Sequence, residues 1–129
     1  MDWDGTWGSG FRGQRAVMDA ADIAAVLAMR DPEGYAEFQL GRVSEKYPCL
    51  SLHVAGERWY IYFFPEEETE PGAFVVGDTP GAEGETRMAA GSDIYVSNDA
   101  LVGGEIALRL ANEFMMTGER PTGVEWFEL

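Results

Sequence analysis

The sequence predicts an α+β fold, with a mainly antiparallel sheet of about six strands and two helices packed on one face. Two stretches carry apolar residues at helical spacing, whereas the other apolar stretches are short, alternate in polarity and follow one another through turns. The chain has 129 residues, of which 46% are hydrophobic. This length and composition predict one domain over residues 1–129, with residues 1–13 as a flexible N-terminal segment.

The first helix is predicted after a short lead-in strand near residues 15–18. Asp19 is a plausible N-cap, and Ile23, Val26 and Leu27 follow at helical spacing. Arg30 suits the last turn of this helix, and Asp31-Pro32 should end it.

The clearest strands form a hairpin over residues 49–64. Apolar residues alternate on each side of the turn at Ala55-Gly56-Glu57. A further strand precedes the hairpin at 36–43, and shorter ones are expected within 73–77, 86–91 and 94–99. The second hairpin strand, "RWYIYFF", carries large side chains on both faces. Either the sheet is covered twice, or one aromatic face is a contact surface.

The second helix is predicted within residues 102–118, where Ile106, Leu110 and Phe114 form one apolar stripe. Gly103-Gly104 has low helix propensity, so the helix should start late. Gly118 suits the position after the last helical turn, and Pro121 prevents continuation. A closing strand then follows, with Val124 and Trp126 toward the core and Glu125, Phe127 and Leu129 on the other side.

The net charge of −14 is unevenly distributed along the chain. Residues 1–64 hold nine acids and six bases, whereas residues 65–129 hold fourteen acids and three bases. Such a chain repels nucleic acid and anionic membranes, because binding to phosphate needs Lys and Arg. It would attract a basic partner and accelerate their encounter, although acidity can also simply maintain solubility.

No catalytic, cofactor or metal motif emerges from the sequence. His53 is the only histidine and Cys49 the only cysteine, and on one strand they would lie about 13 Å apart. That separation excludes a Cys–His nucleophile pair, and one of each cannot form a zinc site without several carboxylates. The single cysteine excludes an internal disulfide, and no secretory signal is recognisable, so we expect a cytoplasmic protein.

The predicted contact residues are acidic and aromatic. Pro65 and Pro71 bracket a loop with four glutamates, which would form a preorganised anionic projection or simply a solvated loop. Aromatic residues of the hairpin and acids of the closing strand complete the set. The residues predicted to contact a partner are Glu66, Glu67, Glu68, Glu70, Trp59, Tyr60, Tyr62, Glu125 and Glu128.

Three stretches resemble the polymorphic-toxin immunity proteins of the Imm family numbered one. They are "YPCLSLHVAGERWYIYFFP", "SNDALVGGEIALRLANEFMMTGERPTGVEWFEL" and, more weakly, "RAVMDAADIAAVL". Together they cover about half of the chain, and "GERPTGVEW" is the most specific piece. The resemblance implies a small, acidic, cytoplasmic, non-enzymatic protein that neutralises a cognate toxin, often a nucleic-acid (cytidine) deaminase. A small carboxylate-dependent enzyme and an acidic adaptor or chaperone for a secreted effector stay as alternatives.

Overall fold

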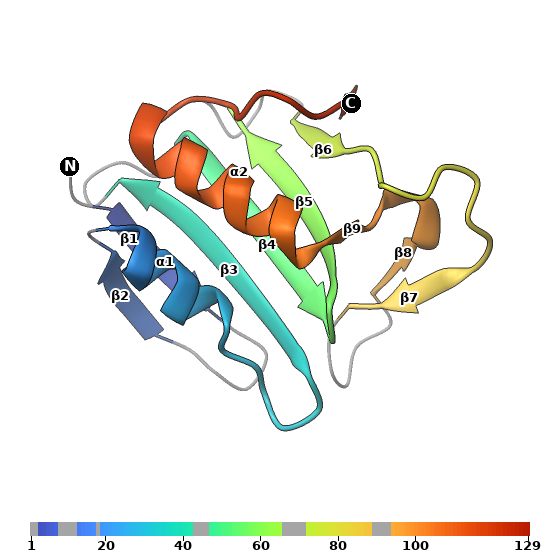
Figure 1. Ribbon diagram of the computed structural model, residues 1–129, viewed down its shortest axis with the longest axis horizontal. Coiled ribbons are helices and arrows are strands. Elements are labelled where there is room, and N and C mark those ends of the chain that lie inside the picture. Colours follow the sequence, from blue (N-terminus) through green and yellow to red (C-terminus); the bar gives the residue numbers. More distant parts are fainter. Residues whose placement is uncertain (1–2, 8–12, 18, 43–46, 66–71, 89–93) are drawn as a thin grey trace.

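The computed structural model describes residues 3–7, 13–17, 19–42, 47–65, 72–88 and 94–129. The chain folds as one antiparallel sheet that carries two α-helices on one face, with a small two-stranded ribbon at one end (Figure 1). The elements are β1 (Trp3–Trp7), β2 (Gly13–Val17), α1 (Ala20–Leu27), β3 (Tyr35–Arg42), β4 (Cys49–Ala55), β5 (Arg58–Phe64), β6 (Ala73–Val75), β7 (Glu85–Arg87), β8 (Tyr95–Ser97), a 3₁₀ turn η1 (Asn98–Ala100), β9 (Val102–Gly103), α2 (Gly104–Thr117) and β10 (Trp126–Glu128).

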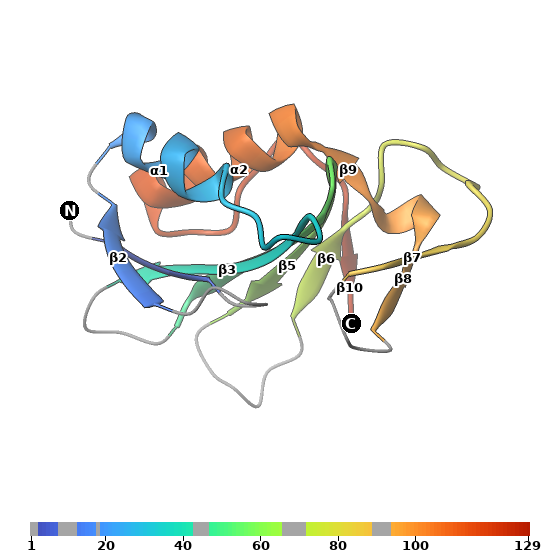
Figure 2. The ribbon, with the colours of Figure 1, turned by 90° about the horizontal axis from the view of Figure 1, so that it is seen from below.

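The predicted α+β class and antiparallel sheet are confirmed. The strands of the main sheet run in the order β10-β6-β5-β4-β3-β1-β2, β9 pairs with β5, and β7 and β8 form the separate ribbon. Both helices lie on the same side of the sheet, as Figure 2 shows. In the part of the chain that the structure describes, no helix is long and apolar enough to cross a membrane.

The N-terminal region differs from the expected flexible segment. Residues 3–7 form strand β1, which pairs antiparallel with both β2 and β3. An unpaired edge of β3 would expose a row of backbone N–H and C=O groups, and β1 supplies their partners. The Asp and Gly residues of this stretch suggest a tail when read alone, but pairing with the sheet outweighs that local preference.

Helix α1 begins as predicted and ends earlier than predicted. The Asp19 side chain accepts a hydrogen bond from the Asp22 amide at 2.9 Å, which caps the first turn. The helix ends at Leu27 instead of near Arg30. The buried Asp31 carboxylate accepts hydrogen bonds from the amides of Glu33 and Tyr35, both at 2.9 Å. This side chain thus holds the following backbone in a turn that competes with further helix.

Helix α2 lies within the predicted range and ends where predicted. It begins at Gly104, with Gly103 in extended conformation as the N-cap. It ends at Thr117, and Gly118 follows with a φ of 69°. A left-handed conformation of this kind carries no steric cost for glycine.

The core lies between the two helices and the sheet. Helix α1 contributes three buried apolar side chains, and α2 contributes its predicted stripe through Leu110 and Phe114. From the sheet come the alternating inward residues of the central strands, which also confirm the predicted hairpin. These sheet residues are Ala36, Phe38, Leu40, Leu50, Leu52, Val54, Trp59, Ile61 and Phe63. Burial of each large apolar side chain contributes on the order of 1.5–3 kcal/mol, so this layer stabilises the sheet against the helices.

The closing strand β10 completes one edge of the sheet by pairing with β6. Trp126 packs against the core, and its indole N–H donates to the Pro121 carbonyl at 2.9 Å. The next residue, Phe127, points the other way and is 53% exposed. The predicted alternation of this strand is therefore confirmed.

Candidate functional site

The side of the sheet that faces away from the helices, here called the outer face, carries an aligned row of side chains. Directly paired residues on neighbouring strands share a face. The strand register places one such row across five strands, from β3 to β10, through Gln39, Ser51, Tyr62, Phe74 and Phe127.

Five aromatic rings of the outer face form one group, here called the aromatic face: Tyr60, Tyr62, Phe64, Phe74 and Phe127. Ring centroids lie 4.5 Å apart for Tyr62 and Phe64, 5.8 Å for Tyr60 and Phe74, and 5.0 Å for Phe74 and Phe127. Four of the rings are half-buried, and Phe127 is more than half exposed. Among the described residues no helix lies on this side of the sheet. Rigid aromatic side chains with hydroxyl tips are typical of protein–protein contact surfaces.

Polar residues continue the outer face from the aromatic face toward β3. His53 pairs in register with Tyr60 on one side and with Glu37 on the other. The Ser51 hydroxyl lies 3.0 Å from His53 Nε2. Burial lowers the pKa of His53, and the negative charge of Glu37 opposes that shift. Burial also raises the pKa of Tyr60, with a further rise from Tyr62.

Ser51, His53 and Glu37 together resemble the residue types of a hydrolytic triad, and the Ser–His contact was not predicted from the sequence. The signal was available, because residues i and i+2 of a strand lie on the same face. Ser51, however, is only 2% exposed and sits in the middle of a regular strand. A substrate therefore cannot reach its hydroxyl, and a paired strand offers no free backbone N–H groups as an oxyanion hole. The contact gives the buried Ser51 hydroxyl and the partly buried His53 ring a hydrogen-bond partner.

The predicted contact residues are only partly brought together. Tyr60 and Tyr62 lie side by side on the aromatic face, whereas Trp59 is on the opposite face, 4% exposed and stacked on Phe38 at 5.9 Å between ring centroids. The loop glutamates 66, 67, 68 and 70 lie outside the described residues.

The two predicted acids of the closing strand differ in their surroundings. Glu125 is exposed, and its backbone carbonyl accepts a hydrogen bond from the Val76 amide. Glu128 is also exposed and forms an ion pair with Arg120, whose guanidinium lies 5.6 Å from the centre of the Trp126 ring. An exposed pair of this kind contributes little to stability. Glu128 is therefore already paired with Arg120, and a cation of a partner would have to displace Arg120 to contact Glu128.

Within the described ranges, no group of three or more His, Cys, Asp or Glu side chains could hold a metal ion. Cys49 is buried on β4 and is not part of a disulfide. The described outer face thus has the chemistry of a contact surface, with aromatic rings, hydroxyls and acids at its margin.

Comparisons with known proteins give a family match for the chain. No curated protein matches the chain. The family model described as "Immunity protein Imm1" matches residues 13–128, which is nearly the whole sequence and includes every described element except β1. The chain therefore belongs to the Imm1 family and is an immunity protein directed against a toxin.

Proposed function

We propose that this immunity protein neutralises a nucleic-acid deaminase toxin, most directly a cytidine deaminase, by covering its basic substrate groove. A deaminase must hold a polyanionic strand and place one base in its active site, so its groove has to be electropositive. A protein with 23 acidic and nine basic residues can compete for that groove through charge alone. The family assignment supports a toxin as the partner, and the acidic charge supports a toxin with a basic, nucleic-acid-binding groove such as that of a deaminase.

The observation that carries the proposal is the aromatic face. Charge accelerates association, but slow dissociation needs a desolvated centre with well-packed aromatic anchors. Tyr60, Tyr62, Phe74 and Phe127 supply such a centre on neighbouring strands of one sheet face. Because these rings sit on paired strands, few conformational degrees of freedom are lost when a partner binds.

The acidic loop belongs to the same proposed contact surface. It connects β5, which ends at Phe64 of the aromatic face, to β6, which begins at Ala73. We propose Glu66, Glu67, Glu68 and Glu70 as the charged margin that meets the toxin's Lys and Arg residues. Glu125 extends this acidic margin at the closing strand, and Glu128 does so if it exchanges Arg120 for a partner's cation.

The proposed mechanism is binding without catalysis, in the cytoplasm of the cell that the toxin would damage. Ser51 and Cys49 are buried, and His53 is held against Ser51 by a hydrogen bond. None of these side chains needs to react, since occupation of the groove is sufficient for inhibition.

The test uses the toxin domain encoded beside this protein. Purified toxin is titrated with the protein while deamination of a single-stranded oligonucleotide is followed. We expect complete inhibition at a one-to-one ratio and a complex that stays intact during size-exclusion chromatography. A stable complex with full toxin activity would favour an adaptor or chaperone. The absence of any complex would refute the proposed function.

A further inference from the structure

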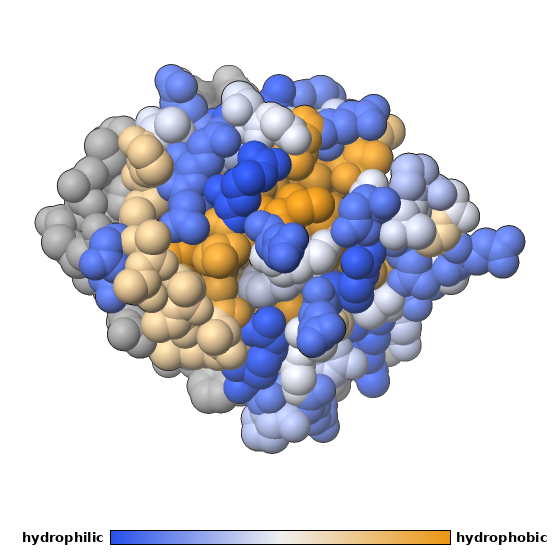
Figure 3. All heavy atoms as spheres, in the orientation of Figure 1, coloured by the Kyte–Doolittle hydropathy of each residue, from blue (hydrophilic) through white to orange (hydrophobic). Residues whose placement is uncertain are grey.

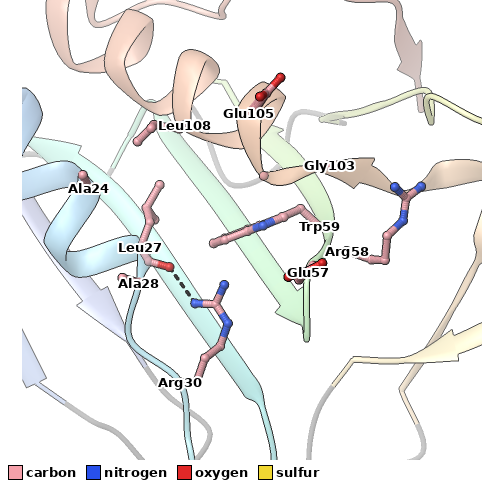
Figure 4. Close-up of a pocket in the computed structure, with 11 residues that line it drawn as sticks. Ala24, Leu27, Ala28, Arg30, Glu57, Arg58, Trp59, Gly103, Glu105 and Leu108 are labelled. Atoms are coloured by element: carbon pink, nitrogen blue, oxygen red, sulfur yellow. Dashed lines mark hydrogen bonds between the residues drawn. The ribbon is translucent and has the colours of Figure 1, made fainter.

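A pocket on the helix-bearing side of the sheet combines apolar walls with charged side chains. Its volume is about 530 Å³, within the range of binding pockets for small ligands and anchoring side chains. Leu27 and Ala24 of α1, Leu108 of α2 and the Trp59 ring form its apolar walls (Figure 4). Figure 3 shows apolar side chains exposed at the centre of this face, with hydrophilic residues around them.

The Trp59 indole N–H is a donor without an acceptor in this pocket. Trp59 is 96% buried, yet no described residue accepts a hydrogen bond from its Nε1. The start of α2 lies beside this nitrogen, because a Cβ added to Gly104 would be 3.6 Å from Nε1. No side chain caps the first turn of α2 either. Among the described residues, the one fully buried side-chain polar atom without a hydrogen-bond partner is Asn112 Oδ1, so Trp59 Nε1 is open to solvent in the pocket. An acceptor of a bound partner can replace the water that this N–H would otherwise contact. The Trp59 N–H is thus a hydrogen-bond donor in the pocket lining, beside the start of α2.

The charges that line the pocket are not equivalent. The Arg30 guanidinium already donates to the carbonyls of Leu27, Met29 and Gly56, at 2.6, 2.7 and 3.3 Å. Arg58 pairs with Asp78 at 2.8 Å and also donates to the Leu101 carbonyl. Both cations are therefore occupied by the protein's own acceptors.

The two acids of the pocket are the charges left for a partner. Glu57 and Glu105 are exposed, and neither has a cation within 4 Å among the described residues. Glu57 lies in the turn of the β4–β5 hairpin, where the sheet ends. Glu57 therefore lies at the hairpin end of the pocket lining.

We propose that this pocket binds a short extended segment of the toxin, in which an apolar side chain is flanked by Lys or Arg. The apolar side chain fills the space between Leu27 and Leu108, and a backbone carbonyl of the segment accepts from Trp59 Nε1. Cations on the two sides of this residue face Glu57 and Glu105, which lie on opposite sides of the Trp59 ring (Figure 4). This inference rests on the proposed function for the identity of the partner, and it adds a second, anchoring contact at the hairpin end of the molecule.

Two adjacent alanines of α1 provide a matched test. Ala24 lines the pocket and Ala25 does not, although both are exposed. Ala24→Phe should fill the pocket and weaken toxin binding by about 30-fold or more, whereas Ala25→Phe should stay within about threefold of the parent. Should Ala24→Phe fail to fold, Leu108→Gln against Met116→Gln repeats the comparison on α2. The proposal would be overturned if the pocket variant and its control bound the toxin with equal affinity in each comparison.

A second comparison tests the charge assignment. The double variant Glu57→Gln/Glu105→Gln should weaken toxin binding by about tenfold or more. Its control, Glu33→Gln/Glu119→Gln, removes two exposed acids away from the pocket and should change the affinity by less than about twofold. An equal loss in both doubles would mean that only net charge matters, which would overturn the assignment of these two acids.

A third experiment needs no toxin and separates this inference from the proposed function. Protein labelled with ¹⁵N at tryptophan is titrated with acetyl-leucyl-arginine amide at millimolar concentration, and the Trp59 indole resonance is followed. We expect a shift in the parent and in Ala25→Phe, a much smaller shift in Ala24→Phe, and weaker binding of acetyl-leucyl-glutamate amide. No shift, or a preference for the glutamate amide, would overturn the pocket's chemistry. If the parent protein forms no complex with the toxin, the proposed function and the toxin as occupant both fail, whereas the dipeptide titration still tests whether the pocket binds an apolar side chain next to a cation.

Discussion

The Phe127 ring stacks on Phe74 across the outermost strand pair, with ring centroids 5.0 Å apart and 21° between the ring planes. One strand further in, Phe74 lies in register with Tyr62. The closing strand therefore extends the aromatic face to the edge of the sheet. Its aromatic ending has two roles, because Trp126 faces the core and Phe127 faces outward.

Phe127→Ala should separate binding from stability. The ring is 53% exposed, so its loss should lower the free energy of unfolding by about 1 kcal/mol or less. Toxin affinity should fall by about tenfold or more, or at least about 1.4 kcal/mol, as expected for an anchor residue. Isothermal titration and thermal unfolding measure the two effects. The control is Met116→Ala, which removes a side chain that is 78% exposed on α2. Similar small changes in affinity for both variants would remove Phe127 from the interface.

His53 should make the fold sensitive to mild acid. Burial lowers its pKa from the ordinary value of 6.5, despite the opposing charge of Glu37. Below pH 6.5 the unfolded chain therefore binds a proton that the folded protein resists, and the free energy of unfolding falls as the pH is lowered toward the folded-state pKa. The His53→Gln variant lacks this pH-dependent contribution to the free energy of unfolding. Urea unfolding of both proteins between pH 7.5 and about 5 should give curves that diverge below pH 6.5. Parallel curves would contradict the lowered pKa.

The side chains of Cys49, Ser51 and His53 should be dispensable for neutralisation of the toxin. Cys49→Ala, His53→Ala and Ser51→Ala should each inhibit the toxin within about threefold of the parent, because none of these side chains has to react with it. Ser51→Ala leaves His53 without its hydrogen-bond partner and should cost about 1–3 kcal/mol of stability. Each variant is therefore assayed only after circular dichroism confirms its fold. Loss of inhibition by a folded variant would support an enzymatic role.

Removal of the loop charges should weaken binding without weakening the fold. The fourfold change of Glu66, Glu67, Glu68 and Glu70 to Gln keeps the shape of the side chains and removes their charge. We expect an affinity loss of at least about 100-fold, or about 2.7 kcal/mol, at an unchanged melting temperature. The association rate should also become less dependent on salt. An affinity within about threefold of the parent would assign the binding energy to the aromatic face alone.

The fold was largely predictable because local signals and tertiary packing agree for most elements. The Asp19 cap, the left-handed Gly118 and the alternation on both sides of Gly56 each act within a few residues. Strand β1 was missed because its local residue types suggest a tail, whereas pairing with β2 on one side and with the distant β3 on the other holds it in the sheet. The early end of α1 was missed because Asp31 was read as a helix breaker and not as the centre of a hydrogen-bonded turn.

The candidate site was less predictable than the fold. Alternation correctly separated Trp59 from Tyr60 and Tyr62, but it could not show which face the helices would cover. The aromatic face also needs Phe74 and Phe127, whose neighbours are set by strand order and register. The pocket at Trp59 depends on where α2 starts relative to β5, and no local pattern encodes that contact.

Competition for the toxin's groove tests the central claim most directly. A fluorescent single-stranded oligonucleotide is bound to a catalytically inactive toxin domain, and its anisotropy is followed as the immunity protein is added at low salt. If the protein covers the basic groove, the anisotropy should fall to that of the free oligonucleotide at a one-to-one ratio of protein to toxin. A further rise in anisotropy would show a ternary complex, in which the toxin holds both partners, and would contradict occupation of the groove.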